Sequence, residues 1–148
     1  MLLYDQLSKT SREVYSRASF EVTNMHHPLM GPEHIVLGLL SKNDNGAYRV
    51  LNSFGVTYED ARRFVKDMHT PVIKDNYPLV HYSASATAVI NAAIDLANGH
   101  ETQTRPTHLL AALLESPDVN VAQLFDSFRV NRQSMLEKTT DAVHVEEN

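Results

Sequence analysis

The sequence contains the same helix-like segment twice, 74 positions apart, and this repeat limits the possible folds more than any other feature. Residues 31–40 (GPEHIVLGLL) correspond to residues 105–114 (RPTHLLAALL). The register continues without a gap, and eight of the 26 positions from Gly31 to Val56 are identical to their counterparts. A repeat of this length indicates a supersecondary unit that was duplicated. We therefore expect two half-domains of similar shape, each presenting a similar surface.

Composition excludes several classes of protein. With 148 residues the chain can bury a substantial core, and it has no cysteine for disulfides, thiolate metal sites or thiol nucleophiles. Its net charge of −5 argues against a nucleic-acid partner, which requires a basic surface. No apolar run approaches the ~20 residues that span a bilayer, and the first residues lack a signal-peptide pattern. We expect a cytoplasmic protein without membrane or nucleic-acid partners.

The apolar residues follow a helical period nearly throughout, without a competing strand pattern. The first half indicates helices that start at Ser8, Pro32, Ala47 and Thr57, and the last of these carries a possible capping box with Asp60. The second half repeats this plan with helix starts at Ser83, Pro106, about Val121 and Asn131.

These patterns predict an all-α fold of eight helices, arranged as two tandem four-helix repeats related by a pseudo-twofold axis. The first repeat covers residues 1–69 and the second 82–140, with a proline-containing linker at 70–81 and a polar tail at 141–148. In each repeat the second helix is the most apolar. We expect its paired leucines to be buried, namely Leu39, Leu40, Leu113 and Leu114.

Catalytic motifs are missing from the sequence. It has no G-x-x-x-x-G-K-[ST], no G-x-S-x-G and no H-E-x-x-H, so we predict a non-catalytic chain without a cofactor. His26, His27 and His34 lie close together, which leaves a small metal protein or enzyme as an alternative, but no matching carboxylates accompany them and no metal ligands are predicted. His34 and His108 occupy equivalent places near helix starts, so we interpret both as packed, hydrogen-bonded structural residues.

The duplicated motif also resembles a known family. Residues 33–40 (EHIVLGLL), with the partial copy at 108–114, are similar to the Clp amino-terminal domain of Clp/Hsp100 AAA+ unfoldases, and most similar to the ClpC type. The resemblance extends over residues 7–140. It implies a domain that receives adaptor proteins and protein substrates for ATP-dependent proteolysis. It also implies that the ATPase ring, and oligomerisation through it, lie outside this chain, in the bacterial cytoplasm or in a plastid.

In the ClpC branch the resemblance further implies a pocket in each repeat for phosphorylated arginine. The glutamate of the Glu-His motif binds the guanidinium group, while a hydroxyl at the start of the repeat's first helix binds the phosphate. Carried over by position, the first pocket consists of Ser8 and Glu33. A carboxylate suits a guanidinium group and a helix start suits a phosphate.

The second repeat departs from this pattern. Ser83 retains the hydroxyl, but Thr107 replaces the glutamate and follows Arg105. Because threonine cannot neutralise a guanidinium group, we expect a degenerate second pocket that still takes part in adaptor docking. Two alternatives remain open: Glu33 only compensates the helix dipole, or the chain is a free-standing homologue that competes for an unfoldase's ligands or partners.

Overall fold

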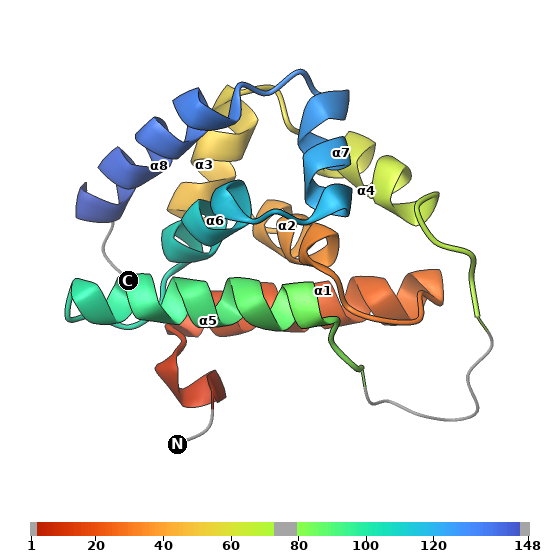
Figure 1. The fold of residues 1–148 in the computed structure, drawn as a ribbon, viewed down its shortest axis with the longest axis horizontal. Coiled ribbons are helices and arrows are strands. Elements are labelled where there is room, and N and C mark those ends of the chain that lie inside the picture. The colour runs from red at the N-terminus through yellow and green to blue at the C-terminus, as the bar shows by residue number, and fades with distance from the viewer. Residues whose placement is uncertain (1–2, 73–79, 146–148) are drawn as a thin grey trace.

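The computed structural model describes residues 3–72 and 80–145 (Figure 1). Over these residues the chain forms eight α-helices after a short 3₁₀ helix, η1 (Leu3–Gln6), and contains no β-strand. The helices are α1 (Lys9–Met25), α2 (Pro32–Leu40), α3 (Gly46–Ser53), α4 (Tyr58–Lys66), α5 (Ala84–Gly99), α6 (Pro106–Glu115), α7 (Val119–Ser127) and α8 (Arg132–Val145). The prediction of an all-α fold with two tandem four-helix repeats is confirmed.

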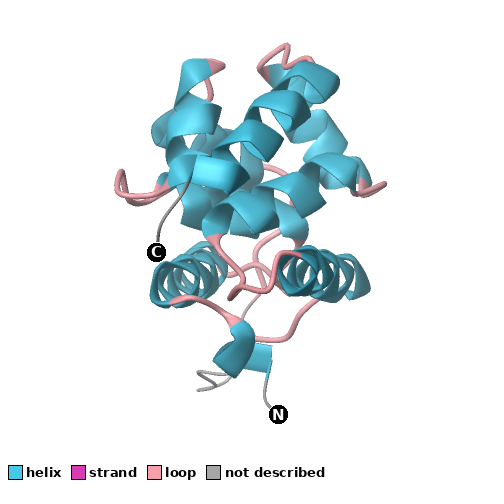
Figure 2. Cartoon of the chain, turned by 90° about the vertical axis from the view of Figure 1, so that its left-hand side faces the viewer, coloured by secondary structure: helices cyan, strands magenta, loops and turns pink. Residues whose placement is uncertain are grey.

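The helices form two layers. The long helices α1 and α5 run antiparallel along one side of the molecule, and the six shorter helices lie above them (Figures 1 and 2). Helices α2 and α6 contact each other at the centre of the second layer, while α3 packs on α8 and α4 on α7. Each half therefore contributes to one shared core.

The duplicated segment forms the central helix of each repeat. Every residue of α2 is buried, as is every residue of α6 except Glu115. A helix that is covered on all sides must be apolar around its whole circumference, which explains why these two segments have the most apolar sequences. The four leucines expected in the core are at most 5% exposed.

Helix ends follow the sequence signals in most places. The Ser8 and Ser83 hydroxyl oxygens accept hydrogen bonds from backbone amides in the first turns of α1 and α5, as expected of N-caps. The capping box expected at Thr57 is wrong, because the Thr57 side chain makes no capping hydrogen bond. Helix α4 ends at Lys66, three residues before the predicted end of the first repeat, and α8 continues to Val145 through most of the predicted polar tail.

Two short backbone pairings cross between the repeats. The Ser8 amide donates to the Thr104 carbonyl, and the Ser83 amide donates to the Met30 carbonyl, both over 2.9 Å. The start of each long helix is thus attached to the loop that precedes the central helix of the other repeat. The predicted linker at 70–81 is described only at its two ends; residues 73–79 lie outside the described residues.

Candidate functional site

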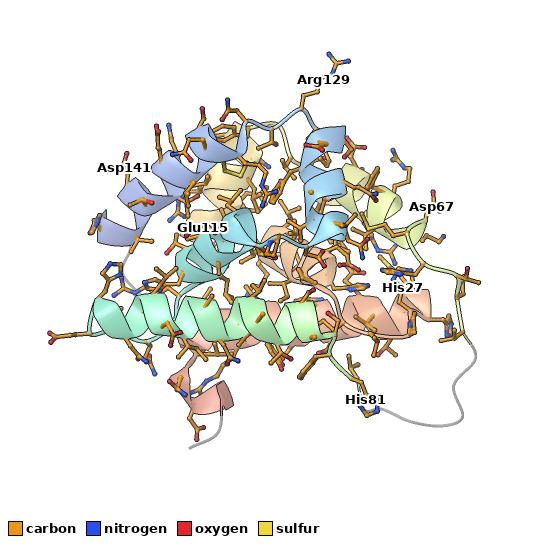
Figure 3. All side chains as sticks on the ribbon, in the orientation of Figure 1. His27, Asp67, His81, Glu115, Arg129 and Asp141 are labelled. Carbon is orange, nitrogen blue, oxygen red and sulfur yellow. The ribbon has the colours of Figure 1, made fainter. Side chains whose placement is uncertain are left out.

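A chain of hydrogen bonds fixes the histidines of the first repeat. His34 Nδ1 accepts from the Gly31 amide (2.9 Å), and His34 Nε2 lies 2.8 Å from His27 Nδ1. His27 Nε2 lies 3.2 Å from the Lys66 carbonyl, which can only accept. One arrangement of protons satisfies all three bonds: His34 Nε2 donates to His27, and His27 Nε2 donates to Lys66. Figure 3 shows His27 between the end of α1 and α4.

The second repeat copies this arrangement. His108 Nδ1 accepts from the Arg105 amide (3.0 Å), and His108 Nε2 lies 3.3 Å from His100 Nδ1. Both His34 and His108 are completely buried. The prediction that these two are packed, hydrogen-bonded structural residues is confirmed.

Burial also determines the charge of these rings. It lowers the pKa of His34 to about 3, and repulsion from His27 and His69 acts in the same direction. Burial likewise lowers the pKa of His108 to about 4, helped by His100 and Arg105. Both rings are therefore neutral at pH 7, and they position the helix starts without supplying a charge.

Glu33 is one of two buried carboxylates in the first repeat, with Glu21 of α1. Glu33 lies in the first turn of α2 and is 1% exposed. Its Oε2 accepts from His69 Nε2 over 2.6 Å and from the Asn120 side-chain amide over 3.5 Å. Its Oε1 has no hydrogen-bond partner among the described residues. A buried carboxylate oxygen without a partner is costly, and this oxygen can accept a further hydrogen bond.

The Glu33 carboxylate folds back over Gly31. A Cβ atom on Gly31 would lie 2.3 Å from Glu33 Oε1, well inside van der Waals contact. The second repeat has Arg105 and Thr107 at the equivalent positions, and the shorter Thr107 side chain is completely buried. The hydroxyl of Thr107 has no hydrogen-bond partner in the part of the chain that the structure describes. The two repeats thus differ in charge at the same place.

Backbone pairing attaches each of the two serine caps to the loop before the central helix of the other repeat. The carbonyl of Met30, three residues before Glu33, accepts a hydrogen bond from the Ser83 amide. Ser8 instead pairs with Thr104, three residues before Thr107, and its hydroxyl is completely buried in a bond with Ser11. The sequence-based grouping put Ser8 with Glu33; by backbone pairing, the helix start that is attached to the loop before Glu33 is that of Ser83.

Sequence reasoning missed the two residues that cover Glu33. His69 follows the end of α4 and its side chain is 26% exposed, while Asn120 comes from α7 in the other repeat. The early end of α4 places His69 in the loop after that helix. No local pattern marks Asn120, because its contact with Glu33 spans 87 positions.

The metal alternative finds no geometric support. Within residues 3–72 and 80–145, no group of three or more His, Cys, Asp or Glu side chains is arranged to hold a metal ion. His27 and His34 bond to each other, and His26 is the left-handed residue that ends α1.

Among the described residues, no helix is long and apolar enough to cross a membrane. A hollow of about 740 Å³ lies at the other end of α2, beside Leu40 and Tyr58.

Comparison with solved structures gives the same fold. The N-terminal domain of the chaperone ClpD from Arabidopsis thaliana superposes with a TM-score of 0.81 over 97% of both chains, at 14% identity. A ClpV N-domain, solved in complex with a VipB peptide, superposes with a TM-score of 0.69 over 95% of this chain and 91% of that chain, at 18% identity. At these identities the similarity shows the fold alone.

Sequence comparisons identify the family. The chain is 26% identical over 133 residues to the ATP-dependent Clp protease ATP-binding subunit ClpC of Staphylococcus aureus (strain USA300). This alignment covers 88% of the chain but only 16% of the relative's length. Residues 6–87, more than half of the chain, match the family described as the Clp repeat (R) N-terminal domain. With the duplicated central helix and the eight-helix fold, this match shows that the chain belongs to the Clp repeat N-terminal domain family.

Proposed function

We propose that this chain is a docking domain that receives adaptor proteins and protein substrates for a Clp-type AAA+ unfoldase. Its relative in Staphylococcus aureus is an ATP-binding subunit of an ATP-dependent protease, and its structural neighbour ClpV binds a VipB peptide through the same kind of domain. The sequence contains no nucleotide-binding loop. The chemistry that uses ATP therefore belongs to other domains or subunits, and this chain contributes binding.

The Glu33 carboxylate carries the finer part of the proposal, which is recognition of an arginine side chain. One of its oxygens has no partner among the described residues and the other is bonded by His69 and, weakly, by Asn120. A planar guanidinium group offers two parallel N–H donors that match the two oxygens of a carboxylate. A ligand of this kind would satisfy the oxygen that now lacks a donor.

The start of α5 makes phosphorylated arginine the preferred form. Ser83 caps this 16-residue helix, and its backbone amide donates to the carbonyl of Met30, three residues before Glu33. The N-terminus of a helix attracts phosphate through its free amides and its dipole. A guanidinium group on Glu33 would place an attached phosphate toward the Ser83 end of α5. Thr107 provides no carboxylate in the second repeat, so we expect one effective site.

His69 acts as an internal substitute for the ligand. Its N–H donates to Glu33 Oε2 over 2.6 Å, the position that a guanidinium N–H would take. Because Glu33 is only 1% exposed, the ligand must displace His69 and Asn120 before it reaches the carboxylate. The partial exposure of His69 makes this movement feasible.

Titration calorimetry with free phosphoarginine tests the proposed site. We expect binding to the wild type, loss of binding in Glu33→Gln, which keeps the shape but removes the charge, and weaker binding in Ser83→Ala. Ser8→Ala is the matched control, because it removes the equivalent cap of the other long helix; it should retain affinity. If Ser8→Ala and not Ser83→Ala abolishes binding, the grouping of Ser83 with Glu33 is wrong. Binding that survives Glu33→Gln would refute the site.

The free-standing alternative is tested separately. A nucleotide-binding motif encoded downstream of Asn148 in the same reading frame would place the domain in an unfoldase. A stop codon directly after the codon for Asn148 would favour a homologue that competes for the same partners.

A further inference from the structure

The exposed side of α1 carries a concentration of positive charge that the Glu33 site does not use. A hollow of about 470 Å³, here called the basic groove, lies between α1 and Lys42, which follows the end of α2. It is lined by four cations and three further side chains, namely Lys9, Arg12, Arg17, Lys42, Glu13, Ser16 and Phe20. Four cations and one carboxylate give the groove a net charge of +3, although the whole chain carries −5.

The positive charge of the groove is only partly neutralised. Glu13 accepts from Lys42, which also lies 3.5 Å from Asp44. Lys9 and Arg17 are exposed and make no ion pair with any described residue. Unpaired cations that share one hollow attract a partner with negative charge over several ångströms.

Phe20 adds an apolar contact to this surface. Its side chain is 56% exposed, an unusual position for a phenylalanine, and it lines the same groove as Arg17. A large exposed apolar side chain inside a charged rim is typical of a surface that a partner covers. The groove therefore combines charge attraction with one apolar anchor.

The second repeat provides an internal comparison. The Ser8 and Ser83 caps align α1 with α5, and the 74-residue offset aligns the residues after α2 and α6. A hollow of about 490 Å³ between α5 and α6 is lined by the residues that this alignment makes equivalent to Glu13, Arg17, Phe20 and Lys42, namely Ala88, Ala92, Asp95 and Ser116. That equivalent hollow is apolar with two carboxylates, Asp95 and Glu115. The duplication preserved the hollow but reversed its charge.

We propose that the basic groove binds an acidic segment of a partner protein, with one large apolar side chain of that segment seated against Phe20. Because the groove carries cations, the partner segment should carry carboxylates. Because Phe20 is exposed in the groove, that segment should also contain an apolar residue. The hydrogen bonds of Glu33 go to His69 and Asn120, and neither of these residues lines the groove. The groove is thus a second docking surface that does not depend on the arginine site.

Fluorescence anisotropy with a labelled peptide of glutamates around a central leucine tests the proposal. The wild type should bind this peptide, and affinity should fall as NaCl rises. Lys9→Glu with Arg17→Glu changes the groove from +3 to −1 (two reversals, each of two charges) and should weaken binding by about tenfold or more. Lys9 lies in the first turn of α1, where a carboxylate is favourable, so this variant should fold.

The matched control is Arg129→Glu with Lys138→Glu, which gives the same total charge on exposed residues outside the groove (Figure 3 shows Arg129 pointing away from the molecule). This control should retain affinity for the peptide, and so should Glu33→Gln. The wild type should prefer the peptide with leucine over a peptide with glycine at the same position, and Phe20→Ser should lose this preference. Equal weakening by the control, or no binding by the wild type, overturns the proposal. Tighter binding of oligothymidine than of the peptide also overturns it, because the groove would then be a nucleic-acid site.

Discussion

Replacing Gly31 by alanine should move the Glu33 carboxylate and thereby destabilise the fold. The new Cβ would lie 2.3 Å from Oε1 and 2.7 Å from Oε2, whereas ordinary contact begins near 3.4 Å. The carboxylate must therefore shift by roughly 1 Å, which breaks its 2.6 Å bond with His69. A hydrogen bond to a charged group contributes about 1.5–3 kcal/mol, and the partial exposure of His69 favours the lower end of that range.

The second repeat suggests how to separate this effect from a general intolerance of alanine. Its equivalent positions, Arg105 and Thr107, combine a Cβ at the first with a short side chain at the second. The backbone of Gly31 has φ −103°, which alanine adopts without strain. In a Glu33→Thr background, Gly31→Ala should therefore lower the free energy of unfolding by less than about 0.5 kcal/mol. The difference between the effects of Gly31→Ala in the two backgrounds, which is the coupling energy of a double-mutant cycle, should be about 1 kcal/mol or more.

Urea denaturation of the wild type, the two single variants and the double variant measures this coupling through the midpoints, provided that the slopes agree. If Gly31→Ala costs the same in both backgrounds, the carboxylate does not depend on the missing Cβ, and the account of the difference between the repeats is refuted.

Three further results are expected. Gly38→Ala should cost about 1–3 kcal/mol in urea melts, because its Cβ would lie 2.4 Å from the backbone carbonyl of Val14 and α1 must move away from α2. The pKa of His34 is 6.5 in the unfolded chain and about 3 in the folded chain, so the stability that the neutral ring provides is present above pH 6.5 and is lost as the pH falls toward 3. In melts of the wild type, this loss should reach about 2 kcal/mol at pH 5. The loss should be smaller in His34→Asn. His69→Ala should strengthen phosphoarginine binding in calorimetry, since it removes the internal competitor for Glu33; weaker binding would make His69 part of the site.

The helices were predictable because their signals are local. Serine caps, prolines in first turns and the strongly apolar segments at 35–40 and 109–114 each act within a few residues, and the repeat itself indicated which helices lie at the centre. The exception, Thr57, shows that a suitable residue at an N-cap position does not guarantee a capping bond.

The arrangement of the candidate site was not predictable, because it depends on contacts between distant residues. The sequence indicated Glu33 and Ser83 separately, but only the structure shows that the backbone of residue 83 pairs with Met30, three residues before Glu33. The cover of Glu33 likewise comes from α7 and from the loop after α4. A duplicated chain leaves open whether equivalent elements pair within or between repeats, and packing of the long helices decides this.

The number of phosphoarginine molecules bound per chain tests the central claim most directly, which is that the first repeat holds the one effective arginine site. Calorimetry should give a stoichiometry near one for the wild type and near zero for Glu33→Gln. Arg105→Gly with Thr107→Glu recreates the glycine and carboxylate of the first repeat at the equivalent positions, and it should raise the stoichiometry toward two. Two equal sites in the wild type, or no binding by the wild type, would contradict the account.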